Sequence, residues 1–580
     1  MKNRLISSFL LASLFVCACA CTKNGTDPDD PFADDPVTPE PQATIYGRVK
    51  KADGTGVGSV IVTDGVNFTK TNGKGVYNLR SDKKNSIVFI TIPAYYRVPD
   101  NLSQPHYWET LTKPADEAER HDFILYEDPG QDSHTRFLFG DIHFYCDKAV
   151  DPFDKFRKKV NAEAKSGVYR TVFGLTLGDM TWDLHWYGLG SNSSGYYGIP
   201  KYLEQSNKIE FPMFCTVGNH DHDMKTPEGK WLNSLGEVNE KGEDWSCEIP
   251  FRRLQGPTCY STNIGKVHYV SVDDAITTDD GTGLTDQDHR NCVFGFTEPD
   301  LEWLKKDLSY VPKTTPIVLT VHIPLSNRGG SLRSPYASKI THPWFKGKNL
   351  GTMLEPFAGR PLLVISAHTH YLFINENLTV DTPSGQVTFT EINNGAVCGN
   401  FWGCAWKGYA MCVDGTPGGY RVLEYNGTKL SNSMYQPYEK KGFYPFRSYD
   451  RNQIEIKGDR AKDFSIQVPN FMTKSTANLV YIHCWDYCSG WTIKVTEDGK
   501  ELPVKDYGGG YDPLYMLMLE NGQVSNDPGK LSHLFEVQAS SPTSTLVISV
   551  TDPYGHTATE TMTRPKVFKL DTYRAEDYSK

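Results

Sequence analysis

Residues 172–183 read VFGLTLGDMTWD and residues 213–221 read MFCTVGNHD, and these two stretches decide the fold of the central part of the chain. In each, an apolar run with the composition of a strand ends at a glycine that is followed by Asp179 or Asn219. Three more apolar runs are followed by the polar motifs Asp141-Ile-His143, His322 and His368-Thr-His370. The sequence therefore predicts five strands whose carboxyl ends carry oxygen and nitrogen donors.

The predicted strands alternate with helix-like stretches. The strands are residues 137–139, 172–177, 213–217, 317–321 and 362–365. Residues 152–164 place apolar side chains on one helical face, and residues 298–308 follow Thr297, a good N-cap. This alternation predicts a largely parallel sheet core, with the five motifs converging at the carboxyl edges of its strands.

The residue types in these motifs suit a two-metal hydrolytic site. Two divalent ions about 3.5 to 4 Å apart need one short bridging carboxylate, with imidazole and amide donors completing each shell. Asp179 is the natural bridge. A hydroxide held between the ions could attack phosphorus in line, and His220 could stabilise the transition state or protonate the leaving oxygen.

The ordered set of motifs resembles the calcineurin-like metallophosphoesterase superfamily, in an exported bacterial form, over residues 134–428. The resemblance implies a central α/β sandwich, with His220 as the catalytic imidazole. It assigns the first metal to Asp141, His143, Asp179 and His370, and the second to Asp179, Asn219, His322 and His368.

Two positions depart from the family pattern. The second aspartate of the family stands three residues after the bridging one, where this chain has Trp182; the carboxylate here is Asp183, and we expect it to orient His220. The last motif begins with Ala367 in place of a glycine, which removes no ligand but asks for a slightly different backbone packing.

The amino terminus predicts export. Lys2 and Arg4 precede an apolar run, residues 5–16, that is typical of a secretory signal. Residues 16–21, VCACAC, resemble a bacterial lipobox, so we expect a lipoprotein signal peptide over residues 1–21 with acylation at Cys19 or Cys21. The acidic, proline-rich residues 22–42 would then tether the protein to a membrane of the cell envelope, and this lipid anchor would be its only membrane contact.

Two flanking regions carry strand patterns without helical periodicity. Residues 43–128 predict a small β-sandwich with a hairpin around Asn72-Gly73. Their sequence resembles that of modules that act as a stalk or spacer. Residues 436–576 predict a second β-sandwich. In it, Trp485, Tyr487 and Trp491 could stack on a sugar, although aromatic residues at strand spacing are more often core. The predicted fold is thus multidomain α+β/α/β, with an α/β sandwich between two all-β domains.

Cysteines and acidic residues offer weaker indications. Of thirteen cysteines, three lie in the signal region, and an oxidising compartment would allow three close pairs, Cys247 with Cys259, Cys398 with Cys404, and Cys484 with Cys488. An acidic run could bind calcium, but its irregular spacing favours a solvated insertion. The run consists of Asp273, Asp274, Asp279, Asp280, Asp286 and Asp288.

The sequence as a whole favours an exported dimetal phosphohydrolase acting on a small phosphomonoester or phosphodiester. The formal net charge of −10 disfavours nucleic acid as a partner, because no basic stripe replaces phosphate counterions. The ligand types suit manganese, iron, zinc or cobalt. The alternative is a catalytically degenerate surface lipoprotein that binds glycan or another ligand. Neither the substrate nor the oligomeric state can be read from the residues.

Overall fold

The computed structural model describes the chain from residue 36 to residue 573 with internal gaps. The described residues are 36–101, 103–182, 197–222, 247–279, 290–336, 346–402, 410–437, 440, 442–464, 466–467, 472–524 and 527–573. They fall almost wholly in the larger of two compact units, Pro39–Lys580. Within these ranges no helix combines the length and the apolar character needed to cross a membrane. The predicted signal peptide and most of the tether lie outside the described residues.

The amino-terminal region forms the predicted sandwich from two sheets. One sheet contains β1 (Ile45–Lys51), β4 (Val76–Leu79), β6 (Tyr96–Arg97), β10 (Glu119–Arg120) and β11 (Phe123–Glu127). The other contains β2 (Ile61–Thr63), β3 (Phe68–Lys70), β5 (Ile87–Ile90) and β9 (Trp108–Thr110), and β7 (Asp100–Asn101) pairs separately with β8 (Gln104–Pro105). Alternate residues of these strands, such as Val49 and Val62, point into a common core.

The expected hairpin at Asn72-Gly73 is wrong. The two strands that flank it do not pair with each other, because β3 pairs with β2 and β4 pairs with β1. The Asn72 side chain instead accepts hydrogen bonds from the backbone N–H groups of Lys74 (2.9 Å) and Val76 (3.1 Å). The turn chemistry is therefore as expected, but the turn carries the chain from one sheet to the other.

This sandwich is also not an independent stalk. Tyr107 packs against Phe214 and Tyr260 of the central region, with ring centroids 5.7 and 5.5 Å apart. The Asn263 backbone N–H donates to the Ile92 carbonyl at 2.9 Å. The amino-terminal module thus shares a hydrophobic core with its neighbour.

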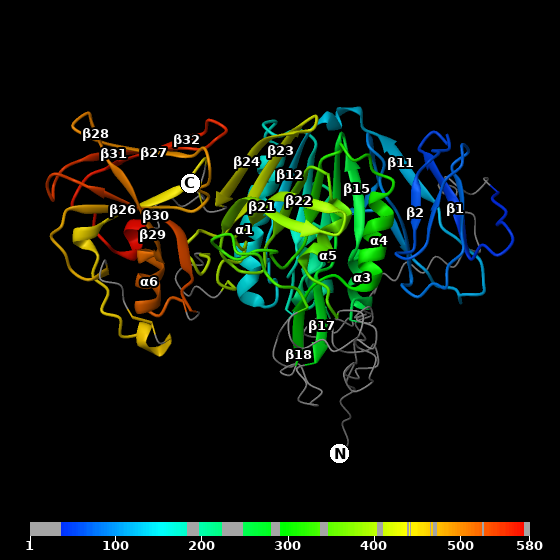
Figure 1. The fold of residues 1–580 in the computed structure, drawn as a ribbon, viewed down its shortest axis with the longest axis horizontal. Coiled ribbons are helices and arrows are strands. Elements are labelled where there is room, and N and C mark those ends of the chain that lie inside the picture. The colour runs from blue at the N-terminus through cyan, green and yellow to red at the C-terminus, as the bar shows by residue number, and fades with distance from the viewer. Residues whose placement is uncertain are drawn as a thin grey trace, which may run out of the picture. The chain divides into compact units, whose positions relative to one another are not determined.

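The central region is built on two sheets, where the sequence suggested one largely parallel core. The first has the order β14 (Met213–Thr216), β13 (Val172–Leu177), β12 (Ser133–Phe139), β23 (Gly419–Asn426) and β24 (Lys429–Pro437). The second has the order β15 (Tyr260–Ile264), β16 (Val267–Ser271), β19 (Ile317–Thr320), β20 (Leu362–Ser366), β22 (Gly385–Asn393) and β21 (Phe373–Thr382), and a hairpin of β17 (Ala275–Asp279) and β18 (Arg290–Phe294) follows β16. The strands that precede the five motifs are parallel to one another within each sheet, as predicted, but they are divided between the two sheets. Figure 1 shows β12 of the first sheet and β15 of the second in the central region.

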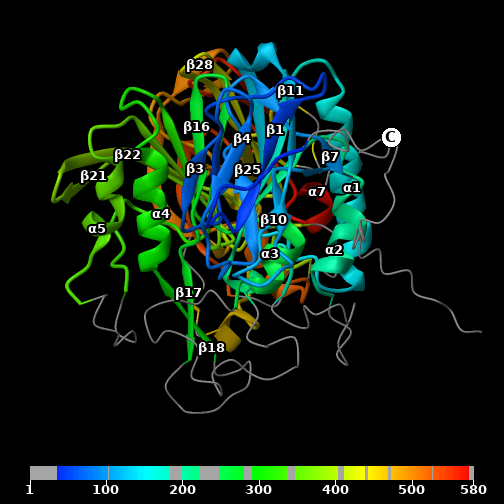
Figure 2. The ribbon, with the colours of Figure 1, turned by 90° about the vertical axis from the view of Figure 1, so that its right-hand side faces the viewer.

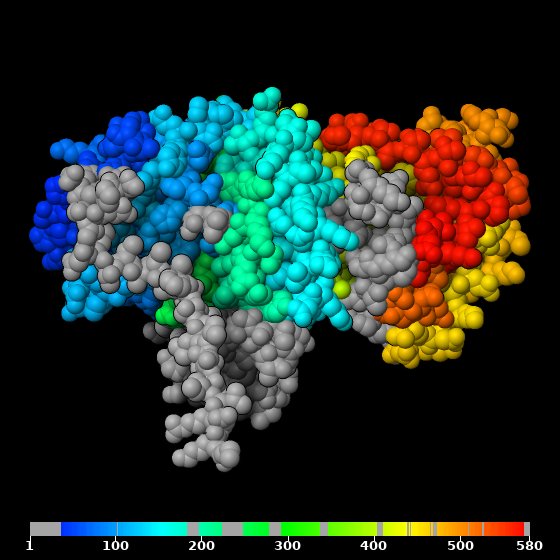
Figure 3. All heavy atoms as spheres, turned by 180° about the vertical axis from the view of Figure 1, so that it is seen from behind, coloured from blue at the N-terminus to red at the C-terminus, as the bar shows by residue number. Residues whose placement is uncertain are grey.

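Side-chain alternation along β12 shows how the layers form. Leu138 joins the core between the sheets, whereas Phe137 and Phe139 face a second cluster with α1 (Asp147–Ala164) and α2 (Ile199–Ser206). The sheets face each other directly, since the rings of Phe214 and Tyr260 stack at 6.2 Å. In Figure 2, α1 and α2 lie to one side of the central strands, and α4 (Glu298–Leu308) and α5 (Leu350–Leu354) lie to the other. The outward side of α1, in cyan, lies on the surface in Figure 3.

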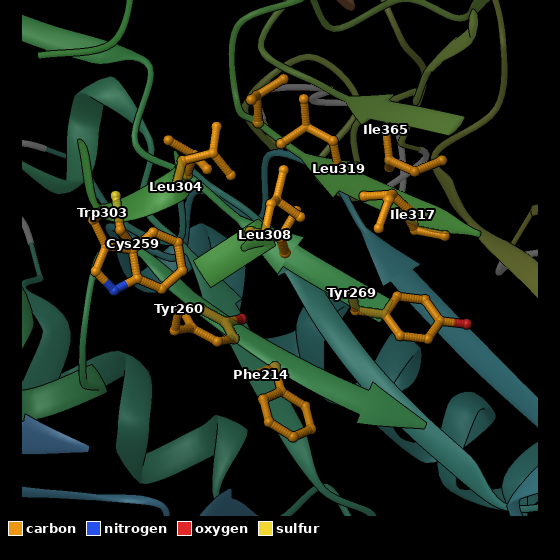
Figure 4. Close-up of a cluster of buried hydrophobic side chains, with 14 of the residues drawn as sticks. Phe214, Cys259, Tyr260, Tyr269, Trp303, Leu304, Leu308, Ile317, Leu319 and Ile365 are labelled. Atoms are coloured by element: carbon orange, nitrogen blue, oxygen red, sulfur yellow. The ribbon is translucent and has the colours of Figure 1, made fainter. Parts of the chain in front are cut away.

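The helices expected from the sequence are present. The α1 helix begins before the predicted stretch and contains Pro152, but it buries Phe153, Phe156 and Val160 as expected. The α4 helix has the predicted bounds, and the Thr297 side chain caps it by accepting the Asp300 N–H. Figure 4 shows Trp303, Leu304 and Leu308 of α4 among side chains from β15, β19 and β20. The short α3 (Ile249–Gln255) follows Glu248.

The carboxyl-terminal region is the second predicted sandwich. Its sheets have the orders β25 (Phe446–Asp450), β26 (Leu479–Cys484), β30 (Lys530–Gln538), β29 (Val504–Tyr511), and β28 (Lys500–Leu502), β27 (Thr492–Glu497), β31 (Leu546–Thr551), β32 (Thr557–Met562). The sequence missed α6 (Pro513–Glu520), which is apolar on nearly every face and therefore has no amphipathic period. The short α7 (Leu570–Tyr573) packs near it.

Two expectations about cysteines and acidic residues are corrected. The expected disulfides Cys247–Cys259 and Cys484–Cys488 are not formed, because Cys259, Cys484 and Cys488 are thiols. The third expected pair includes Cys404, which lies outside the described residues. Asp273 and Asp274 are buried rather than solvated. Asp280, Asp286 and Asp288 lie outside the described residues.

A buried ion pair joins the carboxyl-terminal sandwich to the central region. The Arg421 guanidinium of β23 donates to both carboxylate oxygens of Asp486, at 2.6 and 3.2 Å, and Asp486 also accepts the Tyr435 N–H. Neither charged side chain is more than 4% exposed. Water cannot replace either partner, so removal of one charge would leave the other buried and uncompensated.

We expect an Arg421→Met variant to lose about 3 to 5 kcal/mol of stability, because it leaves the buried Asp486 carboxylate without its counterion. Calorimetric melting of the variant and the wild type measures this loss. A matched control is Lys494→Met, which removes an exposed pair with Glu501 at 3.0 Å and should cost about 1 kcal/mol or less. An Arg421→Met variant that melts like the Lys494→Met control would contradict this role of the pair.

Candidate metal centre

The loops that carry the predicted ligands are held in an uncommon backbone conformation. Five of the seven candidates have positive φ angles: Asp141 (43°), His143 (43°), Asp179 (53°), His368 (70°) and His370 (54°). L-residues rarely adopt this left-handed region, which persists only where the surroundings enforce it. Here the strand-end loops are linked to each other, since the His143 N–H donates to the Asp179 carbonyl at 2.9 Å. In this backbone conformation the side chains of the candidate ligands point toward one another.

The first group of donors consists of Asp141, His143 and His370, whose ligand atoms lie within 4.8 Å of one another. The Nδ1 atoms of His143 and His370 face the carbonyls of Thr181 (3.2 Å) and Gly399 (2.8 Å), so each Nδ1 carries the proton. Their Nε2 lone pairs then face each other at 3.1 Å. Such an arrangement is repulsive alone and is relieved by a shared cation, so these residues fit a metal.

The second group consists of Asp179, His322 and His368, again with ligand atoms within 4.8 Å of one another. Asn219 belongs with them, because its Oδ1 lies 3.0 Å from His322 Nε2 and 2.9 Å from His368 Nδ1. The His322 Nδ1 faces the Leu177 carbonyl at 2.7 Å, which leaves Nε2 directed at the group. All of these donors are oxygen or nitrogen atoms, the set that a borderline divalent cation takes.

Asp179 lies between the two groups. One of its carboxylate oxygens, Oδ2, is 3.1 Å from His322 Nε2 and 3.7 Å from His143 Nε2. Its other oxygen, Oδ1, accepts the backbone N–H of His220 at 2.8 Å. The structure thus brings all seven predicted ligands together and places Asp179 where a bridging carboxylate is required.

Burial and charge set the protonation of these groups. Burial lowers the pKa of His368 to about 3 and that of His370 to about 4, so both imidazoles are neutral donors at neutral pH. At His322 burial acts in the same direction and is the largest single effect, but the Asp179 and Asp141 carboxylates and the Leu177 carbonyl together raise the pKa of His322 to about 10. A cation has to displace this proton before Nε2 can coordinate, so binding at the second group should release a proton.

The two motif glycines make room for the donors. A Cβ on Gly178, whose φ is 92°, would lie 2.4 Å from His322 Nδ1. A Cβ on Gly218 would lie 2.4 Å from both the backbone N and Oδ1 of Asp179. Neither contact is possible for a real side chain, so each glycine is required by the close approach of a neighbouring loop.

The Ala367 departure is accommodated by a third glycine. A Cβ on Gly140 would lie 3.2 Å from the Ala367 Cβ, so the alanine methyl occupies space that Gly140 leaves open. Ala367 is fully buried, and its N–H donates to the His322 carbonyl at 3.0 Å. The alanine methyl is therefore packed in a buried space beside Gly140.

His220 lies beside the donors and packs against an aromatic wall that the sequence did not predict. Its ring stacks on Trp182, with centroids 4.2 Å apart and planes at 24°. Phe401 completes the wall, with its centroid 5.3 Å from Trp182 and 4.5 Å from His370. Trp182 thus occupies the family's carboxylate position and contacts the catalytic candidate directly. Asp183, the predicted orienter of His220, lies outside the described residues.

Two buried carboxylates support the ligand loops, and neither was predicted as part of the site. Asp221 accepts the N–H groups of Gly218 and Met180, each at 3.0 Å, and so ties the loop after β14 to the loop after β13. Asp274 accepts the N–H groups of His322 (3.0 Å) and Ile323 (3.1 Å). The only indication in the sequence that Asp221 lies near the site was its place in the motif that contains Asn219 and His220.

Arg328 and Tyr371 lie near the candidate ligands in the sequence, and they contact each other. The Arg328 guanidinium lies 4.1 Å from the ring centroid of Tyr371, the residue after His370. Its buried Nη1 has no hydrogen-bond partner among the described residues. Such a group can take an oxyanion.

Three family models match the chain. The model described as calcineurin-like phosphoesterase matches residues 135–372, that of the N terminal of calcineurin-like phosphoesterase matches residues 43–128, and that of the C terminal matches residues 391–557. No curated protein sequence matches.

Several solved structures share parts of the fold. A purple acid phosphatase from yellow lupin (Lupinus luteus) is 14% identical, with 54% of this chain and 52% of that one covered and a TM-score of 0.33. PhoD is 11% identical, with 77% and 85% covered and a TM-score of 0.31. A 5′-nucleotidase from Candida albicans is 11% identical, with 52% and 51% covered and a TM-score of 0.27. The chain thus spans about half the length of the first and third of these proteins.

Proposed function

Because the chain belongs to the calcineurin-like phosphoesterase family, we propose that it is an exported dimetal phosphohydrolase that cleaves a small phosphomonoester or phosphodiester. The observation that carries the proposal is the convergence of two donor groups on Asp179, with the Nε2 lone pairs of His143 and His370 facing each other. This arrangement is costly without cations and fits two of them.

The two cations have distinct ligand sets in this proposal. The first cation would be held by Asp141, His143, Asp179 and His370. The second would be held by Asp179, Asn219, His322 and His368. Two divalent ions here supply Lewis-acid activation of the phosphoryl group and of the attacking water. Nitrogen and oxygen donors without thiolate suit manganese, iron, zinc or cobalt.

The chain itself contributes the proton donor and the walls. His220 is held by its backbone N–H on Asp179 and by its ring on Trp182, so its imidazole is positioned to protonate the leaving oxygen. Trp182 and Phe401 offer apolar surface to the leaving group. The Arg328 Nη1 offers a contact for an anionic part of the substrate.

The glycan-binding alternative has less support. Trp485 and Trp491 are 2% and 7% exposed. Trp491 packs in the core of the carboxyl-terminal region, and Trp485 packs against Leu372 and Tyr435 of the central region. Buried indoles cannot stack on a sugar, so packing explains the two tryptophans. Tyr487, the third residue of the predicted cluster, is half-buried and lies against Phe535, with ring centroids 4.7 Å apart. The proposal also includes export to the cell envelope, with a lipid anchor at Cys19 or Cys21. Lys2, Arg4 and the apolar run that follows them support it.

Paired chromogenic substrates test the proposal. The purified protein is stripped with a chelator, reloaded separately with Mn²⁺, Fe²⁺, Zn²⁺ or Co²⁺, and assayed with p-nitrophenyl phosphate and bis(p-nitrophenyl) phosphate. We expect metal-dependent release of p-nitrophenol, and the preferred ester distinguishes a monoesterase from a diesterase. Protein that carries both ions yet hydrolyses neither ester would overturn the proposal in favour of a binding role.

A further inference from the structure

A second group of buried metal-type donors lies apart from the seven predicted ligands. It consists of His222, Glu248 and Asp273, whose ligand atoms lie within 4.8 Å of one another. The three come from different places in the fold: His222 follows the turn of Asn219–Asp221, Glu248 precedes α3, and Asp273 follows β16. None is more than 3% exposed. The sequence did not predict that these three residues lie together, because they are distant from one another along the chain.

The hydrogen bonds of His222 match those of the candidate ligands. Its Nδ1 faces the Gly218 carbonyl at 2.9 Å, so Nδ1 carries the proton, as in His143, His322 and His370. Its Nε2 then faces the Asp273 carboxylate at 2.9 Å. A histidine that donates Nδ1–H to a backbone carbonyl and directs Nε2 at carboxylates has the tautomer and orientation of a metal ligand.

The charges in this group do not balance. Among the described contacts, the Glu248 charge is met by Arg252 at 2.7 Å, and the buried Asp273 carboxylate faces no cationic group except the His222 imidazole. A buried carboxylate requires such compensation. A further carboxylate, the half-buried Asp300, lies nearby: the Cys259 thiol donates to Asp300 Oδ1 at 3.1 Å and accepts the Asp273 N–H at 3.5 Å. Figure 4 shows Cys259 next to Trp303, at the margin of the apolar core.

We propose that His222, Glu248 and Asp273 bind a third divalent cation, separate from the dinuclear centre. One imidazole and two carboxylates are a donor set that suits Zn²⁺. A cation here would neutralise the buried Asp273 carboxylate and take the Nε2 lone pair of His222.

The position of this site indicates a positioning role. His222 is two residues from His220 and three from Asn219, and Asp273 precedes Asp274, which holds the backbone of His322. A cation shared by His222 and Asp273 therefore fastens the loop after β14 to the segment that supports the loop after β19. The site does not depend on the proposed function, because it can bind a cation whether or not the protein hydrolyses an ester.

Counting bound Zn²⁺ in variants of the full chain tests the site. Each protein is stripped, reloaded with Zn²⁺, separated from free metal and analysed for zinc per chain. An Asp141→Asn/Asp179→Asn variant removes both carboxylates of the dinuclear centre and should still hold one tight Zn²⁺. Adding Asp273→Asn should reduce this count from one to none. Adding Glu248→Gln should do the same, and glutamine keeps an oxygen that accepts from Arg252 and Thr258.

A matched buried pair provides the control. Asp307 lies 2.9 Å from His268 Nε2, the same separation as Asp273 from His222, but it belongs to no described group of three donors. Adding Asp307→Asn to the double variant should leave one Zn²⁺ bound. A double variant that binds no Zn²⁺, or one that keeps its ion after both Asp273→Asn and Glu248→Gln, would overturn the proposal. Circular dichroism of each variant establishes that it is folded.

Discussion

An Asp179→Asn variant is expected to lose about 10³-fold in kcat/KM, which corresponds to about 4 kcal/mol of transition-state stabilisation. Asp179 is the only described carboxylate that lies between both donor groups, 3.1 Å from His322 and 3.7 Å from His143. An amide oxygen carries no net charge and cannot bridge two cations equally well. Hydrolysis of the preferred chromogenic ester, together with metal analysis, measures the effect, and we expect the bound metal of the dinuclear centre to fall as well.

Asparagine is close in shape to aspartate, so a loss of activity in the Asp179→Asn variant is not expected to reflect unfolding. The amide oxygen of the new side chain can still accept the His220 N–H that Asp179 accepts at 2.8 Å. Asp307→Asn is the matched control, since it neutralises a buried aspartate that pairs with a histidine elsewhere, and it should retain wild-type turnover. Full turnover and a bound-metal content equal to that of the wild type in the Asp179→Asn protein would rule out a bridging role.

The residues of the candidate metal centre could be predicted because each of them follows a strand and belongs to a short motif. Five apolar runs indicated where strands end, and donor chemistry indicated which side chains matter there. The same signals could not show that β12, β13 and β14 lie in one sheet and β19 and β20 in another. Sheet membership depends on pairing between distant strands, and a single sequence contains no measure of that pairing.

The supports of the centre were missed for a related reason. Trp182 was noted only as the residue that replaces a carboxylate, although it stacks on His220. Asp274 was grouped with a solvated acidic run, although its carboxylate holds the backbone of His322. Trp182 contacts His220 and Asp274 contacts His322, and both partners are distant in the sequence. The residues that flank Trp182 and Asp274 therefore gave no indication of these contacts.

Local patterns also failed where an element lacks a period. The α6 helix buries Leu514, Tyr515, Met516, Met518 and Leu519, so it has no polar face to reveal a helical repeat. The Asn72-Gly73 turn has the right residues for a hairpin, but whether its flanking strands pair with each other is decided by the rest of the sandwich. Residue-level chemistry was thus predicted better than the connections between elements.

A His220→Ala variant is expected to lose about 10²- to 10⁴-fold in kcat while keeping both ions of the dinuclear centre, because the His220 side chain belongs to neither donor group. The chemical reason is the lost proton donor, and the size of the loss should depend on the leaving group. An alkyl phosphate, whose leaving oxygen needs a proton, should lose far more than p-nitrophenyl phosphate, whose phenolate leaves without one. Trp182→Phe is the comparison variant: it keeps a ring against the His220 imidazole and should lose much less. Equal losses with both esters would mean that His220 stabilises the transition state by charge or position and does not deliver the proton.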